Sequence, residues 1–258
     1  MVWLIRRREA FVGMATVLLI AAGALAVTAS RTRAGGRSGL RPALSKLPQG
    51  RVITAVQTQA PEVAITFDDG PDPTYTPAVL GVLRRFGAVG TFFVLGSQVE
   101  RFPSLAQRLV AEGSQVCNHG YAHERLRGRS AAFVRANVAR AARVLARLGL
   151  PHCNLFRFPY FLSDTTARTA VLAMGYRIVA AGCDSSDYQM PPAAAMAQRV
   201  LHCVRPGAII LFHDAGGNRR RTVEALRLVL EGLRALHLQP VTLGQLLESG
   251  AASVPSSA

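Results

Sequence analysis

The feature that most constrains the fold is a regular alternation of short apolar runs with longer helical patterns, from about residue 62 onward. The apolar runs, such as 63–67 and 209–212, are rich in branched and aromatic residues, which is typical of buried strands. Segments with apolar residues three to four positions apart predict helices at 76–86, 103–112, 131–148, 165–174, 193–203 and 222–236. Six or seven strand–helix repeats predict an α/β fold, in which a parallel sheet with right-handed crossovers closes into a barrel.

Polar clusters follow most of the apolar runs. In α/β barrels the functional residues lie where strands pass into the loops at their C-terminal ends. Five such endings in one chain therefore predict a shared rim. The clusters are Asp68 with Asp69, His119 with His123, Arg157 with Tyr160, Asp184 with Asp187, and His213 with Asp214.

Asp68 and Asp69 are the most informative of these residues. Two adjacent carboxylates at a chain turn repel each other, and burial strengthens the repulsion. A fold rarely retains such a pair unless a cation or a proton transfer uses it. The alternative is that Asp69-Gly70-Pro71 forms an ordinary turn, which Asp69 caps.

The motifs together resemble those of a known family. The chain contains, in order, Thr66-Phe67-Asp68-Asp69-Gly70-Pro71, His119-x-x-x-His123, Arg157-x-Pro-Tyr160, Asp184-x-x-Asp187-Tyr188 and Leu211-x-His213. This series is similar to that of the polysaccharide deacetylases with the NodB homology domain, carbohydrate esterase family 4. The resemblance covers residues 51–248 and implies a distorted (β/α) barrel of seven or eight strands. It also implies a hydrolase that removes N-acetyl groups from amino sugars of peptidoglycan or chitin-type oligosaccharide.

A metal site is expected at Asp69, His119 and His123. Two imidazoles and one carboxylate suit zinc, or cobalt or nickel, with positions left open for water and substrate. The alternative, a helix face with histidines four residues apart, fits less well because Asn118-His119-Gly120 directly follows an apolar strand.

The resemblance assigns proton transfer to four further residues. Asp68 matches the family's general base, and Arg157 would keep it ionised and oriented. His213 matches the general acid that protonates the leaving amine, and Asp187 would hold it in the protonated form. For Arg157 the alternative is a surface position, but its apolar neighbours predict burial, and a buried arginine needs a partner.

Three residues are expected to shape the acyl pocket. Tyr160 matches the position whose backbone N–H stabilises the oxyanion, whereas Leu211 and Tyr188 match wall positions, for which core packing is the alternative. The chain also departs from the family pattern. Gly120 replaces the usual Ser or Thr, Phe158 and Phe161 replace the commoner Pro and Gly, and Tyr188 replaces Trp. We expect Phe161 and Tyr188 near the sugar.

The net charge of +15 does not predict a nucleic-acid-binding protein. Residues 1–51 alone hold nine basic residues and one acidic residue, and Lys46 is the only lysine in the chain. Elsewhere the arginines are scattered over predicted helix faces and do not cluster with aromatic residues. Solvated surface is the simpler interpretation, with a modest attraction to anionic wall polymers or lipid headgroups as the alternative.

The N-terminal region predicts export. Arg6-Arg7-Arg8 precedes a largely apolar segment, 11–29, of nearly bilayer length, so residues 1–29 are expected to be a cytoplasmic stub and membrane anchor. A signal segment cleaved near Ser30 is the alternative. Residues 30–50 predict a flexible linker, 51–248 the catalytic domain, and 249–258 a disordered tail.

Four cysteines are consistent with an exported protein but are too few for a disulfide scaffold. Cys153 and Cys203 are expected at the barrel face opposite the rim, where they could pair. Cys117 and Cys183 are expected near the rim as free thiols.

Three other functions remain open from the sequence. An O-deacetylase acting on a xylan-type polysaccharide is the nearest, since an ester needs less help from the acid. A catalytically silent glycan-binding protein could use the same fold. A non-haem iron oxygenase shares the two-histidine, one-carboxylate set but does not need the added base and acid.

We expect the protein to be a monomer.

Overall fold

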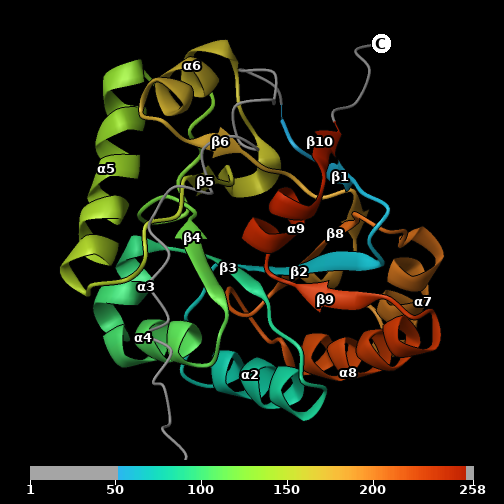
Figure 1. Ribbon diagram of the computed structural model, residues 1–258. Coiled ribbons are helices and arrows are strands. Elements are labelled where there is room, and N and C mark those ends of the chain that lie inside the picture. Colours follow the sequence, from blue (N-terminus) through green and yellow to red (C-terminus); the bar gives the residue numbers. More distant parts are fainter. Residues whose placement is uncertain (1–51, 254–258) are drawn as a thin grey trace, which may run out of the picture. The chain divides into compact units, whose positions relative to one another are not determined.

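The computed structural model describes residues 52–253 (Figure 1). The expected anchor and linker in residues 1–50, and the last five residues, lie outside the described residues. None of the helices within the described range combines the length and apolar character that a membrane crossing requires.

The centre of the fold is a curled parallel sheet. Seven strands run in the order β6-β5-β4-β3-β2-β8-β7, and β9 pairs with the start of β2. The strands are β2 (Glu62–Asp68), β3 (Thr91–Val94), β4 (Gln115–Asn118), β5 (Leu155–Phe156), β6 (Arg177–Ile178), β7 (Cys183–Asp184), β8 (Ile209–His213) and β9 (Gln239–Val241). Every pairing in this sheet is parallel. The predicted α/β barrel of seven or eight strands is confirmed.

The barrel is distorted because β6 and β7 are left as the two edges of the row. The segment that precedes β2 lies along this opening. Ile53 accepts a backbone hydrogen bond from Ala180 at 2.8 Å and donates one to Ile178 at 2.9 Å. Val56 donates to the carbonyl of Gly207 at 2.8 Å. Residues 53–56 thus cover the gap that a further strand fills in a closed barrel, through isolated bridges and not through a continuous ladder.

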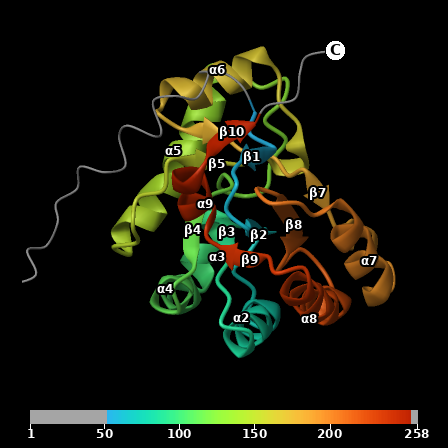
Figure 2. The same cartoon turned by 45° about the vertical axis from the view of Figure 1, so that its right-hand side comes forward.

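Most of the helices surround the sheet on its outer side (Figures 1 and 2). They are α2 (Tyr75–Arg85), α3 (Gly96–Arg101), α4 (Pro103–Ala111), α5 (Ala131–Arg147), α6 (Thr165–Ala173), α7 (Ala193–Cys203) and α8 (Arg220–Ala235). The last helix, α9 (Leu243–Ser249), packs into the inner core instead. The six predicted helices agree with α2, α4, α5, α6, α7 and α8 within two residues at each end. The short α3 and α9 were not predicted.

Side chains along β2 point alternately into two hydrophobic cores, one outside the sheet and one inside it. Val63, Ile65 and Phe67 belong to the cluster that includes the apolar faces of α2 and α8. Ala64 points the other way, into an inner cluster with residues of α9. Because side chains alternate along a strand, Asp68 shares the inward face with Ala64 and therefore points into the barrel.

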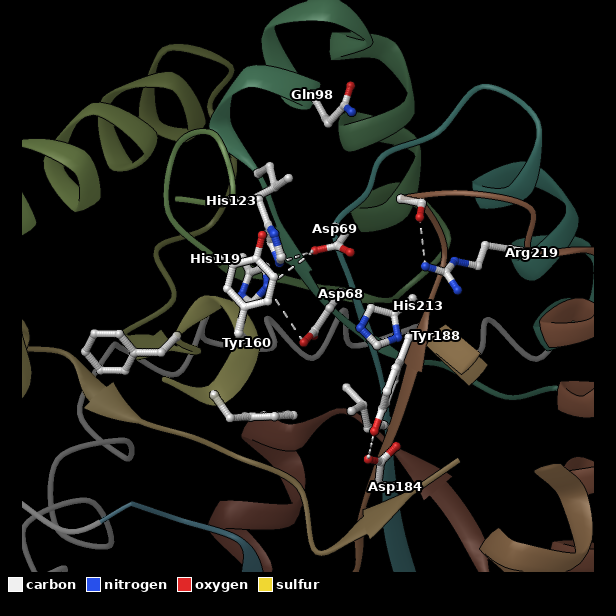
Figure 3. Close-up of a pocket in the computed structure, with 15 residues that line it drawn as sticks. Asp68, Asp69, Gln98, His119, His123, Tyr160, Asp184, Tyr188, His213 and Arg219 are labelled. Atoms are coloured by element: carbon white, nitrogen blue, oxygen red, sulfur yellow. Dashed lines mark hydrogen bonds and ion pairs between the residues drawn. The ribbon is translucent and has the colours of Figure 1, made fainter. Parts of the chain in front are cut away.

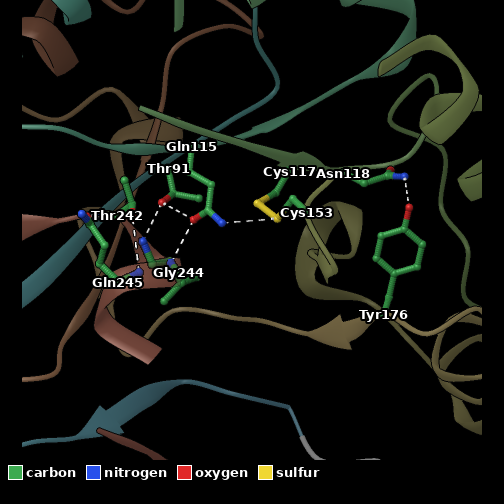
Figure 4. Close-up of a disulfide and its surroundings, with 10 residues drawn as sticks. Thr91, Gln115, Cys117, Asn118, Cys153, Tyr176, Thr242, Gly244 and Gln245 are labelled. Carbon is green, nitrogen blue, oxygen red and sulfur yellow. Dashed lines mark hydrogen bonds between the residues drawn. A yellow bond between two sulfur atoms is a disulfide. The ribbon is translucent and has the colours of Figure 1, made fainter. Parts of the chain in front are cut away.

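The structure contradicts the expected Cys153–Cys203 disulfide. Cys117 bonds to Cys153, with Cα atoms 5.2 Å apart (Figure 4). Cys183 bonds to Cys203, with Cα atoms 5.7 Å apart. Cys117 and Cys153 lie in the inner core, whereas Cys183 and Cys203 lie in the outer core, so the sheet separates the predicted partners. The prediction that Cys117 and Cys183 are free thiols is also wrong.

The expected disordered tail is also partly wrong. Residues Ala251–Ser253 form β10, which pairs antiparallel with β1 (Ala55–Gln57). Gly250 permits this approach, since a Cβ there would lie 2.3 Å from the carbonyl oxygen of Gln57. The folded unit therefore extends at least to residue 253. The sequence offered no strong strand pattern here because the pairing depends on backbone hydrogen bonds to a distant segment.

Candidate active site

A cavity of about 610 Å³ opens where the central strands end, a size typical of small-ligand sites. It holds members of all five polar clusters (Figure 3). The lining residues are Asp68, Asp69, Leu95, Gln98, His119, His123, Phe158, Tyr160, Phe161, Asp184, Tyr188, Leu211, His213, Gly216 and Arg219. The clusters thus share one rim, as the strand endings indicated.

Asp69, His119 and His123 converge within this cavity (Figure 3). One ligand atom from each lies within 4.8 Å of the others. The Oδ1 atom of Asp69 is 3.1 Å from Nε2 of His123 and 3.5 Å from Nε2 of His119. Asp69 follows β2 directly and has a φ of 78°, which turns its side chain out of the alternating pattern of the strand.

The donor set fits a divalent cation. The Nδ1 atom of His119 is 2.8 Å from the carbonyl oxygen of Arg157. Because a carbonyl only accepts, Nδ1 carries the hydrogen and Nε2 presents a lone pair. Oδ1 of Asp69 is buried without a hydrogen-bond partner in the described part of the chain. Two acceptor atoms that face each other in this way repel unless a cation lies between them.

The charges at these residues also suit ligation. Burial would raise the pKa of the Asp69 carboxyl, but a hydrogen bond from His119 and the positive charges of His119, His123 and His213, when these imidazoles are protonated, lower it to about 2. Burial lowers the pKa of His123, against the opposing effect of Asp69. An ionised carboxylate and a neutral imidazole are the forms that bind metals.

Asp68 is held in a different way. Nη1 of Arg157 donates to Oδ1 of Asp68 at 2.7 Å and to Oγ1 of Thr66 at 2.8 Å. Nη2 donates to the carbonyl of Ala180 at 3.0 Å. Arg157 is fully buried and its guanidinium stacks 4.1 Å from the ring centroid of Phe93. The arginine is thus buried with a carboxylate partner, as its apolar neighbours indicated.

His213 and Asp187 form a second carboxylate–cation pair. Oδ1 of Asp187 lies 2.7 Å from Nδ1 of His213, and Oδ2 accepts the backbone N–H of His213 at 2.8 Å. Burial would lower the pKa of His213, but the hydrogen bond and charge of Asp187 raise it to about 9. The imidazole is therefore protonated at neutral pH, with Nε2 as its remaining donor.

The expected pocket residues lie at the cavity wall. Leu211 is buried, whereas Tyr160, Phe161 and Tyr188 are 51%, 42% and 49% exposed. Tyr160 and Phe161 both have positive φ angles, 59° and 54°, which are unusual for bulky residues. The aromatic ring of Tyr160 also meets that of His123 edge-on, with centroids 4.3 Å apart.

Two polar residues that sequence reasoning missed stabilise the loop of Asp187. Oγ1 of Thr222 donates to Oδ2 of Asp187 at 3.0 Å. Arg219 is only 5% exposed, and its guanidinium donates to the carbonyls of Ala215, Gly216 and Asp187. No sequence signal marks Arg219, because two further arginines follow it and both are exposed.

Asp214, next to His213 in the sequence, packs against Gly70, the residue that follows Asp68 and Asp69. Its fully buried carboxyl accepts a hydrogen bond from Oγ1 of Thr76, and burial raises its pKa to about 7. A Cβ at Gly70 would lie 2.4 Å from Oδ2 of Asp214. Gly70 is thus required for the turn that places Asp69 beside the histidines.

Comparison with known proteins agrees with this geometry. The family model for polysaccharide deacetylase matches residues 55–179. A chitooligosaccharide deacetylase of Azorhizobium caulinodans is 33% identical over 212 residues, which cover 77% of this chain and 100% of the relative. A peptidoglycan-N-acetylglucosamine deacetylase of Bacillus cereus is 34% identical, over 78% of this chain and 94% of the relative.

Solved structures show the same fold. A peptidoglycan N-acetylglucosamine deacetylase superposes with a TM-score of 0.73 at 29% identity, over 78% of this chain and 94% of that chain. A family 4 carbohydrate esterase from Streptomyces lividans, in complex with acetate, gives 0.68 at 28% identity, over 78% and 100%. The motifs, the curled barrel and these likenesses agree, and the chain belongs to the polysaccharide deacetylases of carbohydrate esterase family 4.

Proposed function

We propose that this protein hydrolyses N-acetyl groups of amino sugars in a glycan outside the cytoplasm, either peptidoglycan or a chitin-type oligosaccharide. The observation that carries the proposal is the placement of two carboxylate–cation pairs, Asp68–Arg157 and Asp187–His213, at one cavity with the Asp69, His119 and His123 donor set. Relatives named for both substrates support the substrate class.

Asp69, His119 and His123 would hold a divalent cation, with zinc the best match and cobalt or nickel as alternatives. When bound, such a cation supplies Lewis acidity that polarises the acetamide carbonyl and acidifies the attacking water. The protein's own residues must then carry the protons.

Asp68 accepts the proton of the attacking water as its oxygen bonds to the carbonyl carbon. Arg157 orients this carboxylate through the 2.7 Å hydrogen bond to Oδ1. The backbone N–H of Tyr160 would stabilise the developing oxyanion, and Leu211 and Tyr188 would enclose the acetyl methyl group.

His213 completes the reaction as the acid. As the C–N bond breaks, the amine nitrogen takes the proton from Nε2, and acetate leaves from the acyl side. Asp187 holds Nδ1, so the other ring nitrogen is the one available to the substrate. Asp187 thus keeps His213 protonated and leaves its Nε2–H as the proton that faces the substrate.

The metal assignment is tested by metal analysis combined with an acetate-release assay. Chelation should abolish activity, and zinc or cobalt should restore it. His123→Ala should lose metal and turnover, whereas His202→Ala, a solvent-exposed control on α7, should retain both. Full metal content and turnover in His123→Ala would contradict the assignment.

A substrate panel separates the alternative functions. Acetate release from peptidoglycan and chitin oligomers is expected, with little from acetylated xylan. Faster release from xylan would identify an O-deacetylase instead. Glycan binding without acetate release would identify a silent binding protein, and oxygen consumption with bound iron an oxygenase.

We also propose that the domain works outside the cytoplasm, either anchored through the N-terminal segment or released near Ser30. All four cysteines form disulfides, which persist in oxidising compartments. Membrane fractionation of cells that produce the full chain should recover it with membranes. A soluble exported form that begins near Ser30 would show that the segment is a cleaved signal.

A further inference from the structure

The loop between β4 and α5 carries both histidines of the proposed metal site, and residues 119–130 contain no helix or strand. Its backbone is tied to the start of α3, because Gly96 donates to the carbonyl of Gly120 at 3.0 Å and Ser97 donates to that of Tyr121 at 2.9 Å. These bonds hold the first part of the loop. They leave open what fixes the second histidine.

His119 and His123 are held very differently. His119 is 2% exposed, and its Nδ1 bonds to the carbonyl of Arg157. The side chain of His123 is 26% exposed, and the described residues provide no hydrogen bond to its Nδ1. Metal-binding histidines ordinarily use their second nitrogen to fix the ring. The orientation of His123 therefore depends on the edge-on contact with Tyr160 and on the backbone around it, which has a φ of 55°.

Asn137, in the middle of α5, bonds to the loop on both sides of His123, to the backbone before it and to a side chain after it. Its Oδ1 accepts the N–H of Tyr121 at 3.0 Å, and its Nδ2 donates to Oε2 of Glu124. The side chain is 8% exposed and bonds to this loop instead of to its own helix. Asparagine is unfavourable within a helix, so a packed asparagine whose amide serves a neighbouring loop indicates a specific role.

Gly120 makes room for this contact. It has a φ of 85°, and a Cβ at this position would lie 2.8 Å from Oδ1 of Asn137. A serine or threonine, which the family commonly has here, would displace the amide of Asn137. The contact between Asn137 and the loop therefore depends on glycine at position 120.

We propose that Asn137 is a positioning residue for His123, acting with Gly120 and Glu124, and that it sets the affinity of the site for its divalent cation. This inference rests on the proposed metal role of His119 and His123. The amide fixes residues 121 and 124, and the intervening turn then directs the His123 ring toward Oδ1 of Asp69. Without the amide the turn gains freedom, and each metal-binding event must restrict it again.

The test measures zinc affinity of the purified apo protein by competition with a chromogenic chelator, together with Tm. Asn137→Ala should weaken Zn²⁺ binding by about 10-fold or more, the usual effect of removing a partner that orients a metal ligand. Glu124→Ala, at an exposed position that does not endanger folding, should weaken it in the same direction by less. At saturating zinc, kcat should fall much less than the affinity.

Val144→Ala is the matched control, because Val144 is buried in the outer core on the same helix, about two turns after Asn137, and as a valine has no polar group to bond to the loop. It should lower Tm and leave zinc affinity unchanged. Wild-type affinity in both Asn137→Ala and Glu124→Ala, or an equal loss in Val144→Ala, would overturn the inference while the proposed metal site stands. Failure of the wild-type protein to bind zinc, cobalt or nickel would overturn both.

Discussion

The two carboxylate–cation pairs at the cavity have similar geometry and different chemistry. Asp68 bonds to Arg157 and Asp187 bonds to His213, each at 2.7 Å, and both carboxylates are almost fully buried. In the first pair the cation is a guanidinium, which keeps its charge throughout the pH range of activity. In the second pair the cation is an imidazole, which can lose its proton.

The carboxylates also differ in the bonds that their oxygens make. Both oxygens of Asp187 are engaged, by the imidazole and backbone of His213 and by Thr222. Oδ1 of Asp68 is engaged by Arg157, whereas the nearest cation partner of Oδ2 among the described residues is Nε2 of His119, at 3.9 Å. In the first pair the carboxylate of Asp68 is therefore free to accept a proton. In the second pair the imidazole of His213 is the group that donates one.

The largest effect is expected when the acceptor is removed. Asp68→Asn keeps the shape of the side chain but cannot take the proton, so kcat/KM for an N-acetylated chitin oligomer should fall by about 10² to 10⁴-fold. Tm should also fall, because Arg157 is left buried without its counter-charge.

Asp72→Asn is the matched control for Asp68→Asn. Asp72 lies in the same loop but outside the cavity, and its Oδ1 accepts the backbone N–H groups of Thr74 and Tyr75. Asparagine can make the same bonds, so activity should stay close to wild type. A loss comparable to that of Asp68→Asn would assign the effect to the loop and not to the base.

The pH profile distinguishes the donor side. His213 must be protonated to act, so activity should be present below its pKa and fall as pH rises through about 9. Asp187→Asn removes the charge that contributes most to raising this pKa, ahead of Asp68 and Asp69, so the pKa of His213 should fall. The alkaline limb of the kcat profile should move to lower pH, which pH–rate measurements on both proteins would reveal. An unmoved limb would mean that another group titrates there.

The smallest effect is expected at Thr222. Thr222→Val removes one of the three hydrogen bonds to the Asp187 carboxylate, so the alkaline limb should shift to lower pH by less than Asp187→Asn shifts it, and kcat should fall a few-fold. Thr222→Ser retains the hydroxyl and should restore the wild-type limb. If valine and serine behave alike, the hydroxyl does not position Asp187.

Features set by periodicity were predictable from the sequence. The buried parallel strands and six of the helices follow from spacing alone, and the strand endings indicated which polar residues share the rim. The disulfides were not predictable in this way. Cys117 reaches Cys153 because β4 and β5 are neighbours in the sheet, and this adjacency is a property of the three-dimensional pairing.

Residues that support the site from other elements were equally hidden. Arg219 begins a run of three arginines, and Asn137 stands in an alanine- and arginine-rich helix, so nothing in the sequence distinguishes either one. Their roles become visible only in the structure, where Arg219 is buried and Gly120 leaves room for the amide of Asn137. Local patterns can indicate the groups that carry the chemistry, whereas the groups that orient them depend on tertiary packing.

The most direct test compares Asp68→Asn and His213→Ala on an N-acetyl amide and on an acetyl ester of the same sugar. Asp68 serves the attack of water, which both substrates require, so Asp68→Asn should reduce kcat/KM for both by a similar factor. His213 protonates the leaving group, and an amine needs this far more than an alkoxide. His213→Ala should therefore cost about 10²-fold or more on the amide and much less on the ester. Equal losses on the two substrates for His213→Ala would contradict its role as proton donor and with it the division of labour between the two pairs.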